Sequence, residues 1–212
     1  MKRAIAFLIA VLSVSAMFAE NKIELIGPFS KEGLAGVLEE KGIRVIDNGQ
    51  PLCEIWFRKA VPVGAAKAEA AVVYPQLKES TFLGVITFPS AAKDYRGLMI
   101  QPGTYGLRYA LQPADGNHMG TAPNRDFLVL TPLDAENDPS ATPPFEQLMI
   151  AADKASGGSH PWSLSLVPPG GAETPKVTTN DAGHLILVWK LSTADGSALP
   201  LALVVKGVSE GL

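Results

Sequence analysis

The sequence has a single cysteine, Cys53, among its 212 residues, so no disulfide bond can form within one chain. Positive charge is also scarce. Eighteen Lys and Arg face 21 Asp and Glu, the formal net charge is -3, and no block of basic residues occurs. We therefore expect no nucleic-acid partner. Cys53 lies in the apolar stretch LCEIWF, and we expect it to be a buried small hydrophobe.

No apolar run reaches the roughly 20 residues that a membrane-spanning helix needs. The uncharged run from Ala4 to Val14 follows Lys2 and Arg3 and precedes small residues at 16 and 19, which is the pattern of a secretory signal peptide. We expect a signal peptide over residues 1–19 and one domain over 20–212. The mature chain is then periplasmic or secreted, with no membrane span after cleavage. A membrane anchor at residues 4–14 is the alternative.

Common catalytic motifs are missing as well. The chain has no Gly-rich phosphate loop, no HExxH, no CxxC and no GxSxG. Ser159, His160 and Asp153 lie close in sequence, but no sharp turn presents the serine as a hydrolase requires. These absences favour a protein that is not an enzyme.

Turn-forming residues and apolar residues are abundant. There are 17 prolines and 20 glycines, and 47% of the residues are apolar. Short alternating stretches are separated by turn signals such as Asp47-Asn48-Gly49, a favoured hairpin turn. The pattern predicts an all-β fold, mainly an antiparallel β-sandwich or jelly roll, with one or two short helices. The helices are expected near residues 30–41 and 143–155, and one strand is expected over 94–100.

The segment from Gln101 to Pro132 carries the densest polar cluster. Its first strand, residues 104–111, alternates, and we expect the face with Tyr105, Leu107 and Tyr109 to point to the core. The polar loop after it predicts a ligand site. The candidate ligand-binding residues are Arg108, Asp115, Asn117, His118, Arg125 and Asp126.

Arg108 and Arg125 flank this loop and suggest two readings. With Asp126 they could clamp a carboxylate or phosphate group. Alternatively, one of the two arginines forms an ion pair with Asp126 and ties the loop to the strands. The loop's Asp and Asn side chains could also serve only to bond the loop's own amides.

Metal binding is a further hypothesis. His118 and Met119 are adjacent and could bind copper or zinc, with the remaining ligands drawn from Cys53, His160 or His184. Asp115, Asn117 and Asp126 could instead hold calcium, although the spacing is not that of an EF-hand. Otherwise no cofactor is expected, and His160 and His184 are taken as isolated structural or solvated side chains. Two aromatic residues, Trp56 and Tyr95, either stack on a sugar ring or are buried.

Four stretches carry a resemblance to a known group of proteins. They are CEIWFRK at 53–59, DYRG at 94–97, PGTYGLRYALQPADGNHMG at 102–120 and RDFLVLTP at 125–132. On these residues the chain resembles uncharacterised exported bacterial proteins with a β-sandwich domain of unknown function. The resemblance implies an exported β-sandwich and no established activity.

The leading functional hypothesis is an exported, non-catalytic β-sandwich protein that binds a small molecule, a glycan or a partner protein of the envelope through the 112–126 loop. The second is a metal-binding protein or metal-dependent enzyme centred on His118, with Cu, Zn or Ca. A purely structural envelope component is the third.

Overall fold

Ten strands form one antiparallel sheet in the computed structural model, which describes residues 21–114, 122, 124–158, 160–171 and 173–209. Along the sheet their order is β1-β2-β3-β4-β7-β8-β9-β12-β11-β10, and β5 pairs with β6 in a separate hairpin. The strands are β1 (Lys22–Ile26), β2 (Gly42–Asp47), β3 (Gln50–Phe57), β4 (Phe82–Phe88), β5 (Ala92–Lys93), β6 (Met99–Ile100), β7 (Gly103–Leu111), β8 (Asp126–Pro132), β9 (Ser163–Val167), β10 (Lys176–Thr179), β11 (Leu185–Ser192) and β12 (Ala198–Lys206).

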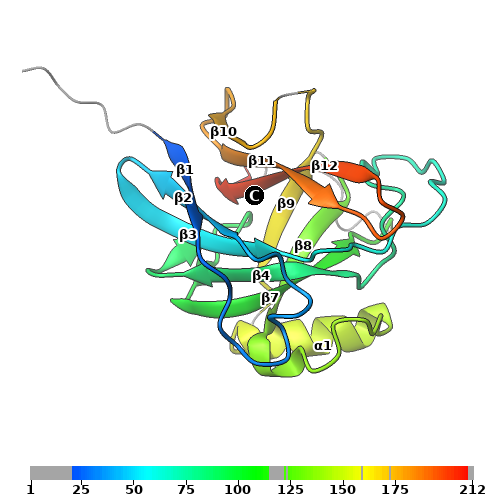
Figure 1. Ribbon diagram of the computed structural model, residues 1–212. Helices are drawn as coiled ribbons and strands as arrows, with labels where there is room; N and C mark the ends of the chain where they lie inside the picture. Colours follow the sequence, from blue (N-terminus) through cyan, green and yellow to red (C-terminus); the bar gives the residue numbers. More distant parts are fainter. Residues whose placement is uncertain (1–20, 115–121, 123, 159, 172, 210–212) are drawn as a thin grey trace, which may run out of the picture.

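The large sheet curls until its edge strands β1 and β10 lie near each other, so it forms a nearly closed barrel (Figure 1). This confirms the all-β, antiparallel prediction. The two layers of the expected sandwich are opposite walls of one curved sheet. Within the described residues, no helix is long and apolar enough to cross a membrane.

Alternating apolar residues fill the interior. On β7 the inner face carries Tyr105, Leu107 and Tyr109, as the alternation predicted. These residues share one core cluster with residues from other strands, such as Ile55 and Leu203. Asn48 and Gly49 make the β2–β3 turn with positive φ values of 50° and 78°, as the Asn-Gly signal predicted.

One α-helix, α1 (Phe145–Ala155), covers the outer face of β7 and β8 (Figure 1). Its apolar side buries Leu148 and Ala152 against Ala110 and Val129. A 3-10 turn, η1 (Leu133–Ala135), follows β8. The helix expected at residues 30–41 is wrong: that segment forms turns, although its apolar residues still pack, together with Trp56, on the outer face of the sheet.

Each end of the barrel is closed by a connecting segment. At the end where β3, β7, β9 and β11 begin, the β5–β6 hairpin folds over the opening; we call this the His184 end. At the opposite end, where β8 begins, residues 58–81 cross the opening and bury Tyr74 and Leu77; we call this the Asp126 end. The single strand expected over 94–100 is therefore a turn and one arm of a hairpin.

Candidate functional site

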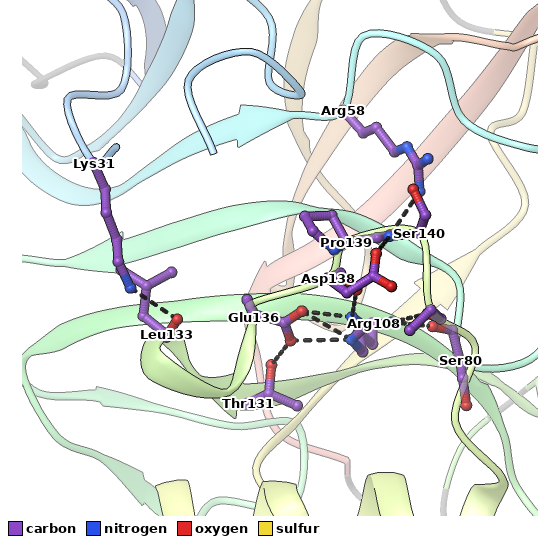
Figure 2. A network of polar contacts seen from close by, with 11 residues as sticks. Lys31, Arg58, Ser80, Arg108, Thr131, Leu133, Glu136, Asp138, Pro139 and Ser140 are labelled. Atoms are coloured by element: carbon purple, nitrogen blue, oxygen red, sulfur yellow. Dashed lines mark hydrogen bonds and ion pairs between the residues drawn. The ribbon is translucent and has the colours of Figure 1, made fainter. Parts of the chain in front are cut away.

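Arg108 lies on the outer face of β7 and is buried (Figure 2). Its Nε donates to both carboxylate oxygens of Glu136 at 3.0 Å, and its Nη2 donates to Glu136 Oε2 at 2.6 Å. This geometry is a buried, bidentate ion pair.

The remaining donors of the guanidinium reach backbone carbonyls. Nη1 donates to Ser80 O at 2.7 Å and to Ala141 O at 2.8 Å, and Nη2 donates to Asp138 O at 3.3 Å. Phe82 lies 5.6 Å away, with its ring facing the cation. All five N–H groups of Arg108 therefore have acceptors within the protein, and none is left for a ligand.

The same network fastens the segment after β8 to the sheet (Figure 2). Thr131 donates to Glu136 Oε1 at 2.5 Å. Gly106 leaves room for Glu136, since a Cβ there would lie 2.7 Å from Glu136 Cγ. At its border Arg58 donates to Pro139 O at 2.9 Å. Burial and the charge of Arg108 lower the pKa of Arg58. We conclude that Arg108 is structural.

Asp126 is buried on the opposite face of the sheet from Arg108. It faces Leu111 in the β7–β8 ladder and so points into the barrel, whereas Arg108 points out. Its Oδ2 accepts from Val73 N at 2.8 Å, and its Oδ1 accepts from Tyr74 N at 2.9 Å. The predicted clamp of Arg108, Arg125 and Asp126 is therefore wrong, because the sheet separates two of its members.

Two tyrosines complete this buried cluster. Tyr109 donates its hydroxyl to Asp126 Oδ1 at 2.6 Å. Tyr74 donates to Val167 O at 2.7 Å and accepts from Ala202 N at 2.8 Å, so its hydroxyl joins β9 to β12. Burial raises the pKa of both phenols, and the Asp126 carboxylate raises that of Tyr109 further. Asp126 thus holds the segment that closes its end of the barrel.

Arg125 is half-buried and forms an ion pair with Glu69. Its Nε donates to Gln112 O at 2.7 Å, and its backbone N–H donates to Ala71 O at 2.9 Å. Among the described residues neither arginine pairs with Asp126, so the ion pairs expected with Asp126 are also wrong. Arg125 instead fastens the base of its loop to the segment that includes Glu69.

The four central residues of the predicted site, Asp115, Asn117, His118 and Met119, lie outside the described residues. Their ligand and metal roles stay predictions. The loop's described part has structural contacts: Ala122 packs against an outer apolar patch that includes Val188 of β11 and Ala202 of β12.

The candidate metal ligands that the structure describes do not lie close together. No group of three or more His, Cys, Asp or Glu that could hold a metal occurs in the part of the chain that the structure describes. Cys53 is sealed in the barrel core, where burial raises the pKa of its thiol, and His160 is exposed. Both oxygens of Asp126 already accept hydrogen bonds, which argues against the calcium arrangement.

His184 is buried at its own end of the barrel and has a defined role there. Its Nε2–H donates to Val208 O at 3.0 Å, and its backbone N–H donates to Asn180 Oδ1 at 2.8 Å. Tyr95 meets the imidazole edge to face at 5.5 Å. Gly207 lies directly against the ring, since a Cβ there would come within 2.3 Å of it. His184 therefore holds the C-terminal segment 207–209.

The motif DYRG at 94–97 shapes the same end. Asp94 is buried, and its Oδ1 accepts from Arg96 N at 2.9 Å and from Leu98 N at 2.8 Å. Burial raises the pKa of Asp94, and the hydrogen bonds to its carboxylate oppose that rise. Tyr95 O accepts from Ser209 N at 2.8 Å. Tyr95 and Trp56 are both buried, so the sugar-stacking alternative is wrong for both.

Between the β5–β6 hairpin and the C-terminal segment lies a cleft of about 500 Å³. We call it the His184-end cleft. Its apolar lining includes Leu52, Ala92, Met99, Val205 and Val208, and its charged residues are Asp47, Lys93 and Lys206.

Two exposed apolar side chains mark this cleft. Among the described residues four large hydrophobic side chains are exposed, and two of them, Met99 (50%) and Val208 (36%), line the cleft. The sequence reasoning missed both. The signal was weak: Met99 followed a segment that read as one continuous strand, and Val208 stands alone near the end of the chain.

Comparisons with known proteins do not assign the chain to a family. No protein-family model, no curated protein and no solved structure matches the chain.

Proposed function

We propose that the protein is an exported, non-catalytic binding protein that takes a small, largely apolar molecule in the His184-end cleft. The single observation that carries the proposal is the meeting of Met99 and Val208 in a cleft of about 500 Å³. Small-molecule sites are typically clefts of roughly 300–1,000 Å³, lined mostly by apolar side chains. Exposed apolar side chains that gather at one place mark such sites.

The surrounding structure supports this role. The cleft lies at the strand ends of the barrel, and hydrogen bonds of Asp94 and His184 hold its walls. The barrel interior itself is filled by apolar side chains, so a ligand is expected to bind outside the core. The proposal keeps the binding function inferred from the sequence and moves the site away from the 112–126 loop.

A neutral fluorescent probe, phenylnaphthylamine, tests the proposal on the mature chain. We expect its fluorescence to rise saturably with the wild-type protein. Met99→Glu places a charge in the apolar lining and should abolish binding. Ile150→Glu is the matched control, because Ile150 on α1 is 53% exposed and lies on the outer side of the barrel.

Equal melting temperatures for the two variants would show that both are folded. If the wild-type chain does not bind the probe, or if the Met99 variant binds it as well as the Ile150 variant does, the proposed function is wrong.

A further inference from the structure

The charges at the His184-end cleft are unevenly paired. Lys206 Nζ lies 2.5 Å from Asp47 Oδ2, so these two residues neutralise each other across the cleft. Lys93 lines the same cleft, and among the described residues it has no carboxylate within ion-pair distance. His184 also lines it, with Nε2–H committed to Val208 O. Within the part of the chain that the structure describes, the cleft therefore carries one uncompensated positive charge.

That charge stands next to apolar surface. Lys93 and Met99 are directly opposed in the β5–β6 pair, so both side chains project from the same face of the hairpin. Met99 is exposed and lines the cleft with Lys93. A ligand on this face meets a flexible apolar side chain and an ammonium group within one cross-strand pair.

We infer that the ligand of this cleft is a free amphipathic acid, a small molecule with an apolar body and one anionic group that contacts Lys93. This inference rests on the proposed function and adds the chemical class of the ligand. The apolar body lies against Met99, Val205 and Val208, and the anionic group stays at the rim, where water and the ammonium both solvate it.

Two probes with the same aromatic skeleton test the inference. Anilinonaphthalene sulfonate carries one anionic group, and phenylnaphthylamine carries none. We expect the sulfonate to bind about two- to fivefold more tightly, which is the gain that one solvent-exposed ion pair typically gives.

Lys93→Met keeps an unbranched apolar chain of similar length and removes the charge. It should lower the affinity for the sulfonate to that of the neutral probe and leave the neutral probe unchanged. Lys154→Met, at an exposed position on α1, is the control and should change neither affinity. High salt should lower the affinity for the sulfonate and leave the affinity for the neutral probe unchanged.

The outcomes separate the two proposals. If the neutral probe does not bind, the proposed function fails. If both bind equally, or if the preference for the sulfonate survives in the Lys93 variant, the cleft binds apolar molecules and the inferred ligand class is wrong. Octanoate should displace the sulfonate, and vesicles of phosphatidylglycerol should not. Displacement by the vesicles alone would show a lipid surface as the partner and overturn the inference.

Discussion

Replacing Arg108 by Met should greatly lower the free energy of unfolding, because it leaves the Glu136 carboxylate buried without a cation. The side chains of Arg108 and Glu136 are 5% and 1% exposed. Breaking one partner of a buried pair typically costs about 3–5 kcal/mol. For a domain of this size that corresponds to a fall in melting temperature of roughly 6–20 °C. The carbonyls of Ser80 and Ala141, which Arg108 also contacts, lose their donor as well.

A double-mutant cycle separates the pair from its surroundings. Urea unfolding followed by tryptophan fluorescence gives the free energy of unfolding for Arg108→Met, Glu136→Gln and the double variant. We expect the double variant to be more stable than the sum of the single effects predicts, by about 2 kcal/mol. Arg44→Met and Glu54→Gln form the control cycle, since that pair lies on the outer face of β2 and β3 with side chains 36% and 23% exposed.

Water screens the Arg44–Glu54 pair, so its coupling should be far smaller than that of Arg108–Glu136. The reasoning is refuted if Arg108→Met costs less than about 1 kcal/mol, well below the range for a broken buried pair. It is equally refuted if the two cycles give the same coupling. A loss of ligand binding at unchanged stability would instead restore the ligand-contacting role that the sequence suggested for Arg108.

Three further predictions follow from buried groups. Tyr74→Phe leaves Val167 O and Ala202 N without their shared hydroxyl, so urea unfolding should show a loss of about 2–4 kcal/mol, and an unchanged midpoint would contradict the bridge. Cys53 should not react with a disulfide reagent such as DTNB in the native state and should react fully in urea, because burial raises its pKa and blocks access; rapid native labelling would contradict its place in the core. Burial raises the pKa of three of the four tyrosines, Tyr109 among them, so ionisation is disfavoured in the folded state. The stabilisation that these buried tyrosines contribute should be complete below about pH 10 and should fall as the pH rises above it. Tyrosinate absorbance and urea unfolding midpoints on either side of about pH 10 would measure this. Ionisation of these tyrosines in the folded protein at their ordinary pKa would contradict it.

Local patterns predicted most of the barrel. The strands β3 and β7 alternate between core and outer positions, and Asn48-Gly49 forms the turn that its backbone preference demands. These features are visible in sequence because burial on one face of a strand repeats every second residue. The β5–β6 hairpin was missed, because Asp94 turns the chain through bonds from its side chain to the backbone N–H groups of Arg96 and Leu98.

The candidate site was harder to predict than the fold. Arg108 and Asp126 were predicted to bind a ligand, but the structure gives them partners from distant segments: Glu136 lies 28 residues after Arg108, and Tyr74 lies 52 residues before Asp126. Nothing in the local pattern indicates such pairs. The His184-end cleft was missed for the same reason, since it joins a hairpin near residue 93 to residues at the end of the chain.

The joint between β9 and β12 divides the fold into two consecutive meanders. In the first meander each strand of the large sheet pairs with the one before it, from β1 to β9, and β10 to β12 form the second in the same way. The two meet where β12 returns to β9, a junction of two paired residues on each strand that the Tyr74 hydroxyl reinforces. Strands of the first meander can therefore pair as soon as they are made, whereas the edge of β9 must wait for the last strand of the chain. The slowest step in folding is then expected to be the docking of two preformed halves, since long-range pairing bears the largest cost of loop closure.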